Sequence, residues 1–407
     1  MSNLIIKNDT IYFFLILILP LTLLFGTLIS EITIFLVAIF FLFSCYQKNK
    51  WKWIKSIEFK FLIVIWIYLI LNAILANNIS LAMPRALFFL RFIILAFAIS
   101  EVLKNQKFSK FIFIFWIIII IFTFIDIYFE FFFGKNIFGN ISDYPGRISS
   151  FTGKELKIGH YMLAIFLLPF SYFINMNKNI GINTFLIFIL TFVLFSIIIT
   201  GERSNTIRAI FCFFMFIFFI QKKYFFFNKY LILLLTLMSL YLTINYENTI
   251  KSRYSEIIEN ASNPITLVKK SLHGSHYSTA WKIFRNYTFF GVGNKNFRIE
   301  CQNQIYVDQD YKYTENRCST HPHQIYLELL SELGILGTLL IITFVTYAVI
   351  KSMYSYFKNY NLILIASCAY ITSIFIPILP SGSFFTSFGA TLFWINIGVM
   401  FSITSKT

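Results

Sequence analysis

Residues 111–133 read FIFIFWIIIIIFTFIDIYFEFFF, an apolar run whose two charged residues both come late in the stretch. A helix of roughly 20 apolar residues crosses a hydrocarbon core of about 30 Å, so this stretch predicts a membrane-spanning helix. Similar runs recur along all 407 residues, of which 58% are hydrophobic and 13% charged. Soluble domains carry about 25% charged residues, and the alternating pattern of membrane barrel strands is missing. The sequence therefore predicts an all-α polytopic membrane protein.

Twelve transmembrane helices are expected, with a large periplasmic loop between the ninth and the tenth. The chain then divides into spans one to nine (1–246), a large loop with short helices (247–332) and spans ten to twelve (333–407). Long loops are uncommon in proteins unless they have a function. The predicted spans are residues 11–30, 32–46, 60–76, 85–103, 111–133, 158–175, 183–200, 204–220, 229–246, 333–350, 361–379 and 383–403.

Lysines mark one side of the predicted bundle. Every second loop, counted from the N-terminus, contains lysine and no arginine, whereas the short loops on the other side, such as 77–84 and 380–383, contain neither. The positive-inside rule then predicts that both termini are cytoplasmic. The net charge of +16 is thus explained by topology. No nucleic-acid-binding motif accompanies it, and no nucleic-acid partner is expected.

The arginines lie in spans or on the side opposite the lysine-rich loops. Arg203 follows Thr200-Gly201-Glu202 at the start of the eighth span, and Arg147 lies in an outer loop at 134–157. Arginine binds phosphate through paired hydrogen bonds that lysine cannot make, and arginine at membrane depth typically faces a functional cavity. A local ion pair with Glu202 is the alternative for Arg203, and snorkelling to the interface is the alternative for Arg85.

Residues 319–334 read STHPHQIYLELLSELG and predict a short helix at the outer surface. Ser319 or Thr320 can cap it, and a proline suits its first turn, while Gly334 marks a bend into the tenth span. His321 and His323 then lie at the helix start, where they can transfer protons near neutral pH. A hydrogen-bonding role and a metal site are the alternatives, although two residues at this spacing do not share a helix face. We favour a general base or acid.

Two cysteines, Cys301 and Cys318, fall in the large outer loop. The bacterial periplasm permits disulfides, and a bridge here would stabilise the loop by about 3 kcal/mol in the entropy model. A disulfide is therefore predicted, with two reduced thiols as the alternative.

Several motifs of the large loop, taken together, resemble the O-antigen ligase and polymerase superfamily. The matching stretches are WKIF at 281–284, FGVGNKNFR at 290–298, and HPHQ at 321–324 followed by ELG at 332–334. TGERS at 200–204 resembles a short external turn of the family, and Arg147 followed by FTG at 151–153 loosely matches an earlier element. The resemblance covers about residues 140–340. Two departures stand out: Gln324 replaces the usual Asn, and the family's Arg a few residues before the tryptophan is missing before Trp281.

The resemblance implies a GT-C-like, metal-independent and cofactor-free glycosyltransferase on the periplasmic face of the bacterial inner membrane. Its donor would be a glycan linked to undecaprenyl diphosphate. A ligase would pass the glycan to the lipid A-core, and a polymerase would pass it to another glycan repeat. The acceptor hydroxyl needs a base, for which His323 or His321 is expected. The diphosphate needs cations, for which the candidates are Arg203, Arg147, Arg298, and Arg285 or His276 in place of the missing Arg.

A transporter or flippase is the alternative from a different functional class. Such proteins place ionisable groups near the membrane midplane, often in two repeated halves. Here most ionisable groups fall at the outer edge of the predicted spans, and the sequence shows no internal repeat. Membrane lipids are expected to surround the bundle in either case.

Overall fold

The computed structural model describes residues 2–221 and 264–405, together with positions 233–234, 236–238, 241, 251 and 255. Most of the predicted ninth span therefore lies outside the described residues. The described part is helical and contains no strand, and eight of its helical segments are long and apolar enough to cross a membrane. The predicted all-α polytopic membrane protein is confirmed.

Each of the other eleven predicted spans overlaps a helix of the structure. The long apolar segments are α2 (Thr27–Lys48), α3 (Ile57–Ile74), α4 and α5 (Ile79–Phe88 and Leu90–Leu103), α6 (Gln106–Phe133), α7 and α8 (Ile158–Ile165 and Leu167–Met176), α9 (Ile180–Ile199), α16 (Ile325–Asn359) and α18 (Ser387–Thr404). Three further helices correspond to the remaining predictions, namely α1 (Ser2–Phe25), α10 (Arg203–Phe219) and α17 (Leu362–Ile374).

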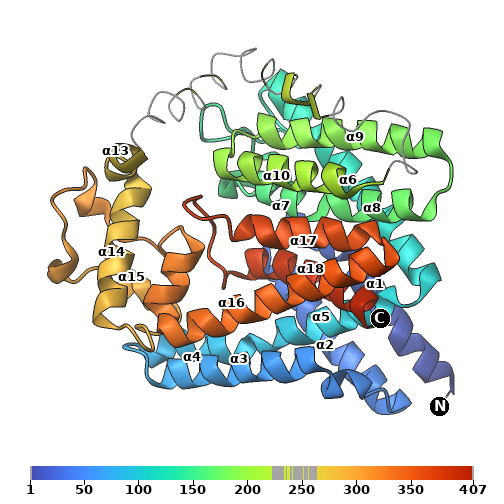
Figure 1. Cartoon of the computed structure of the whole chain (residues 1–407), viewed down its shortest axis with the longest axis horizontal. Helices are drawn as coiled ribbons and strands as arrows, with labels where there is room; N and C mark the ends of the chain where they lie inside the picture. Colours follow the sequence, from blue (N-terminus) through green and yellow to red (C-terminus); the bar gives the residue numbers. More distant parts are fainter. Residues whose placement is uncertain are drawn as a thin grey trace.

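The bundle helices run along the long axis of the molecule, while α14 (Leu272–Asn286) stands across one end (Figure 1). Two short helices lie beside α14 there, α13 (Pro264–Lys269) and α15 (Phe297–Glu300). We call this end of the bundle, with the segments 134–157, 264–324 and 375–386, the loop end. It is the end at which the sequence places its arginines and histidines.

The large loop has a small core of its own. Six buried side chains from α14, α15 and the turns around them pack together: Ala280, Ile283, Val292, Phe297, Cys301 and Tyr306. Cys301 is bonded to Cys318, the predicted disulfide partner, with the two Cα atoms 5.4 Å apart. The buried guanidinium of Arg317 donates to the carbonyl oxygens of Cys301 and Gln302, both at 3.0 Å. The loop is thus a packed unit.

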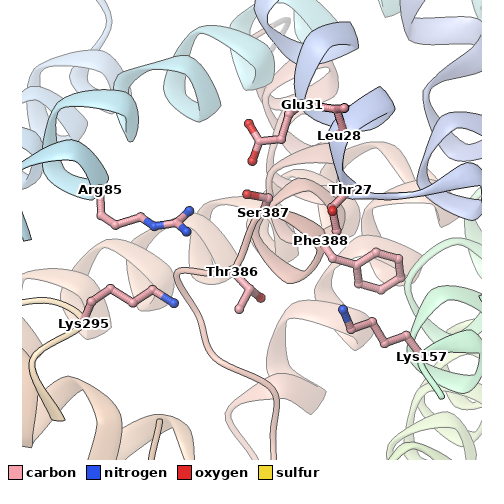
Figure 2. Close-up of a pocket in the computed structure, with 9 residues that line it drawn as sticks. All are labelled: Thr27, Leu28, Glu31, Arg85, Lys157, Lys295, Thr386, Ser387 and Phe388. Carbon is pink, nitrogen blue, oxygen red and sulfur yellow. The ribbon is translucent and has the colours of Figure 1, made fainter. Parts of the chain in front are cut away.

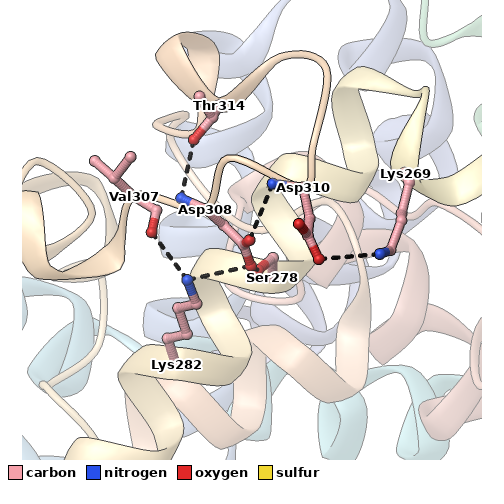
Figure 3. A network of polar contacts seen from close by, with 7 residues as sticks. All are labelled: Lys269, Ser278, Lys282, Val307, Asp308, Asp310 and Thr314. Carbon is pink, nitrogen blue, oxygen red and sulfur yellow. Dashed lines mark hydrogen bonds and ion pairs between the residues drawn. The ribbon is translucent and has the colours of Figure 1, made fainter.

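Two aspartates hold the turn at 307–314 against α13 and α14 (Figure 3). Lys282 forms an ion pair with Asp308 at 3.1 Å, and Lys269 forms one with Asp310 at 3.2 Å. The Ser278 hydroxyl also donates to Asp308 at 2.6 Å. These carboxylates are therefore occupied by the loop's own side chains.

The loop docks on a bend in α16 where only glycine fits. The helix is interrupted at Gly334, whose φ of 66° and ψ of −173° confirm the predicted bend. A Cβ there would lie 2.3 Å from the carbonyl oxygen of Phe289. Backbone hydrogen bonds join the two segments at this contact: Val292 to Ser331 (3.0 Å), Gly293 to Glu332 (2.9 Å) and Ile335 to Thr288 (2.8 Å).

Candidate active site

Four of the five histidines converge at the loop end. His273 and His276 lie three residues apart on α14, which places them on one face of that helix. His321 and His323 come from the turn that precedes α16. The His323 ring is central, because its centroid lies 4.0 Å from that of His321, 5.1 Å from that of His273 and 5.2 Å from that of His276. Two segments far apart in the sequence thus build one cluster.

The predicted cap of the helix after these histidines was wrong. Gln324, and not Ser319 or Thr320, is the N-cap of α16, and its side-chain oxygen accepts a hydrogen bond from the Leu327 N–H at 2.8 Å. The reason is the backbone of His323, whose φ of 59° is left-handed and cannot continue into a helix. Both histidines therefore lie in a turn outside the helix.

Hydrogen bonds separate the roles that the two predicted histidines can play. His321 uses both ring nitrogens, since Nε2 faces the Ser381 carbonyl oxygen at 3.3 Å and Nδ1 faces the Thr320 hydroxyl at 3.0 Å. His323 contacts the Ser319 hydroxyl through Nε2 at 3.0 Å. Its Nδ1 has no hydrogen-bond partner in the described part of the chain. Of the two, His323 is the ring with a nitrogen left for a substrate.

The histidine rings are neutral at neutral pH. Burial lowers the pKa of His323 to about 3 and that of His321 to about 4, and neighbouring rings and cations act in the same direction. Burial likewise lowers the pKa of His276. A neutral imidazole can accept a proton, so His323 can serve as a base. The sequence offered His276 as one substitute for the family's missing arginine. Because its ring is neutral, His276 cannot supply that positive charge.

His273 belongs to the cluster although the sequence analysis did not single it out. Burial lowers its pKa to about 4, and the charges of His276 and Arg203 lower it further. Arg203 is thus near enough to act electrostatically on His273. The sequence feature that could have identified His273 is its spacing of three residues from His276, which places both rings on one face of a helix.

Arg203 and Arg147 are brought to the same region by two neighbouring loops. The backbone N–H of Ile148 donates to the Thr200 carbonyl oxygen at 3.2 Å, which ties the loop carrying Arg147 to the turn before α10. The buried carboxylate of Glu202 accepts hydrogen bonds from the Gly159 N–H at 2.8 Å and the Asn205 side chain at 2.6 Å. Burial raises the pKa of Glu202, and the nearby Arg147 acts against that rise.

Of the two other predicted cations, Arg298 lies near the histidines and Arg285 does not. Arg298 donates to the Thr320 carbonyl oxygen at 3.1 Å and is close enough to lower the pKa of His321. Arg285 is exposed on α14, nine residues and therefore about 13 Å of helix beyond His276. The structure thus places Arg298, and not Arg285, beside the histidines.

Two carboxylates one turn apart on α16 position the loops around this site. Glu332 accepts hydrogen bonds from the backbone N–H groups of Lys295 (2.8 Å) and Phe297 (3.4 Å). Glu328 accepts from the Ser383 hydroxyl and from the Phe384 N–H, the latter at 2.9 Å. The ELG stretch at 332–334 therefore combines a carboxylate that holds the loop backbone with the glycine bend.

A comparison with protein families matches residues 185–342 of this chain to the family described as O-antigen ligase. The matched segment runs from α9 into α16 and contains Arg203, Arg298 and the four clustered histidines, while Arg147 precedes it. No curated protein matches the chain. The family is one of glycosyltransferase-type enzymes that use lipid-linked glycans. The chain is therefore a multi-pass membrane protein whose residues 185–342 are similar to the O-antigen ligase family, and the predicted resemblance to the O-antigen ligase and polymerase superfamily is confirmed.

Proposed function

We propose that the protein is an O-antigen ligase that transfers a glycan from undecaprenyl diphosphate to a sugar hydroxyl of the lipid A-core. The observation that carries this proposal is the convergence of a neutral base and a cation at one site. His323 is 5.1 Å from His273 between ring centroids, and the charge of Arg203 acts on His273. Acid–base transfer and diphosphate departure need these two kinds of group.

The reaction is a direct displacement in which His323 is the base. The acceptor hydroxyl oxygen bonds to the anomeric carbon as the bond from that carbon to the diphosphate oxygen breaks. The diphosphate leaves with the electron pair, and Nδ1 of His323 takes the hydroxyl proton. Nε2–H then donates to the Ser319 oxygen, a contact of 3.0 Å, so Ser319 is a positioning residue. Attack opposite the leaving group inverts the anomeric centre.

Arginines stabilise the charge that develops on the departing diphosphate. Arg203 and Arg147 approach from the start of α10 and from the preceding outer loop, and Arg298 approaches from α15. Preorganised cations in a site that excludes water contribute strongly to such a step. His276 donates from Nε2 to the Asn316 carbonyl oxygen at 3.1 Å. Its buried Nδ1, which has no partner in the described structure, is then an acceptor that can bind a sugar hydroxyl and not the diphosphate.

The proposal places the loop end on the periplasmic face of the inner membrane and both termini in the cytoplasm. The lysine-rich loops support this orientation through the positive-inside rule. The Cys301–Cys318 disulfide supports it independently, because disulfides persist in the periplasm and are rare in the cytosol.

The test uses His323→Ala and Arg203→Ala in cells that lack the native copy, and the same variants as purified protein. Removal of a general base lowers the rate by about 10²–10⁴-fold, so surface lipopolysaccharide should lose its added glycan. Lys312→Ala is the control, because Lys312 is exposed at the same end of the bundle. Full transfer by both folded variants would reject the proposal.

A second arm of this experiment separates ligase from polymerase. Purified protein is incubated with undecaprenyl-diphosphate-linked glycan and either core lipid or a second molecule of donor. Extension of the core lipid supports the ligase. Extension of the donor glycan alone assigns the protein to the polymerases of the same superfamily.

A further inference from the structure

A cavity of about 400 Å³ lies at the loop end. Its size is within the range of about 300–1,000 Å³ that is usual for small-molecule sites. Three cations from separate segments line it: Arg85 on α4, Lys157 before α7, and Lys295 between α14 and α15. Figure 2 shows the charged ends of all three pointing toward its centre. None of these residues has a role in the proposed transfer step.

Two of the cations approach each other without a bound counter-charge. Within residues 2–221 and 264–405, neither the guanidinium of Arg85 nor Nζ of Lys295 forms an ion pair or a hydrogen bond. Lys295 is only 7% exposed. Burial lowers its pKa, and the nearby charges of Arg85 and Arg298 lower it further. Like charges held together in this way are stabilised when an anion binds between them.

The acidic groups around the cavity are already bound elsewhere. Glu31, which lines it, forms an ion pair of 2.8 Å with Arg91. Lys157, which also lines it, forms an ion pair with Glu155. Glu328 and Glu332 lie near enough to raise the pKa of Lys295, but their oxygens accept hydrogen bonds from the loops, as described above.

Two uncapped helix N-termini add backbone donors to the same wall. Thr27 begins α2 after Gly26, which has no side chain to cap it, and Ser387 begins α18 after Thr386. The Thr386 hydroxyl donates to the Ser383 carbonyl at 2.9 Å and does not cap the helix. Thr27, Thr386 and Ser387 all line the cavity. Helix N-termini bind phosphate through free N–H groups and the positive end of the helix dipole.

We propose that this cavity binds the phosphate of a lipid-borne substrate, with Arg85 and Lys295 as its principal ligands. This inference deepens the proposed function, because both the polyprenyl diphosphate donor and the phosphorylated lipid A acceptor carry such a group. Lys295 also connects the cavity to the reacting groups, since its charge acts on His321. A phosphate held here would anchor the substrate next to the base.

The experiment measures binding and does not depend on transfer. Full-length protein in nanodiscs is titrated with undecaprenyl diphosphate, with a phosphorylated lipid A, and with inorganic diphosphate. Arg85→Gln and Lys295→Gln should each weaken binding by about tenfold or more, because hydrogen bonds to charged groups are among the stronger ones. Arg85→Lys should restore part of the affinity, and Lys312→Gln should bind as the wild type does.

Each outcome can be assigned. Cation-dependent binding of the polyprenyl diphosphate alone supports the proposal with the donor as ligand, and the same dependence for lipid A alone supports it with the acceptor as ligand. Competition by inorganic diphosphate shows that the phosphate itself is recognised. Equal affinities in the wild type, both glutamine variants and the control overturn the proposal, provided that thermal melts show folded proteins. If binding does not depend on the cavity cations but His323→Ala still abolishes glycan transfer, the cavity proposal fails and the proposed function stands.

Discussion

Replacing Gly334 by alanine should separate the large loop from the bundle. The backbone of this residue occupies a region that is nearly exclusive to glycine, and another residue there costs about 1–3 kcal/mol. The new Cβ would also lie 2.3 Å from the Phe289 carbonyl oxygen and 2.6 Å from the Gly291 nitrogen. Both are backbone atoms, so the docked segment would have to move as a whole.

The expected loss follows from the contacts that this movement would break. The docked segment makes three backbone hydrogen bonds of 2.8–3.0 Å to α16, each worth about 1 kcal/mol. Together with the backbone strain, the loss of unfolding free energy should be roughly 3–5 kcal/mol. Glycan transfer should fall with it, because the displaced segment leads directly into Lys295 and Arg298.

Equilibrium unfolding in mixed detergent micelles measures this loss, and Gly382→Ala is the matched control. Gly382 lies in the loop before α18, where an added Cβ meets nothing within 4 Å. The control should therefore stay within about 0.5 kcal/mol of the wild type. If Gly334→Ala unfolds like Gly382→Ala and retains transfer, the large loop is not positioned by this contact and our reasoning about the site fails.

Two further predictions concern the same loop. Replacing Cys301 and Cys318 together by serine should lower its stability by about 3 kcal/mol, measured as faster proteolysis of the loop, and reductant should then have no additional effect. Stability should also fall as the pH drops from about 6.5 towards 4. The folded-state pKa values of His321 (about 4) and His323 (about 3) lie below the ordinary value of 6.5, so the unfolded chain binds more protons in that window. The loss is up to about 1.4 kcal/mol per pH unit for each ring, and melts of His321→Gln should show a shallower dependence than the wild type.

The transmembrane architecture could be predicted because its signal is local. Each apolar run, such as 111–133, is long enough on its own to identify a span, and the glycine bend at Gly334 is visible as a residue type. The same holds for the two cysteines of the loop. These features depend on neighbours in the sequence, and the structure agrees with them.

The composition of the site could be predicted only in part because it depends on long-range docking. The motif at 321–324 identified His321 and His323, but His273 joins them only when α14 packs across the bundle end. The left-handed backbone of His323 likewise moved the helix cap to Gln324, a change that residue preferences alone do not reveal. Lys295 stood inside a recognised motif, yet its role depends on Arg85, which is distant in the sequence.

The carboxylates of the loop end favour an enzyme over a transporter. Asp126 and Glu130, late in α6, would be candidates for an ion pathway. Asp126 instead accepts hydrogen bonds from the Ile137 N–H (2.7 Å) and the Ser150 hydroxyl (2.5 Å), while Glu130 accepts from the Ser149 and Ser150 N–H groups (3.1 and 2.6 Å). Glu328 and Glu332 on α16 likewise accept hydrogen bonds from loop backbone N–H groups.

Acidic side chains at this end therefore serve to fix loop backbones, and this use has an electrostatic consequence. Glu328 and Glu332 act electrostatically on Lys295, but their oxygens accept hydrogen bonds from the loops, and within the described residues no carboxylate forms an ion pair with Arg85 or Lys295. A pathway for cations would need the opposite arrangement, with carboxylates facing the open space. A diphosphate-bearing lipid suits the arrangement that the loop end has, because its charge is negative and its tail can lie among the apolar helices.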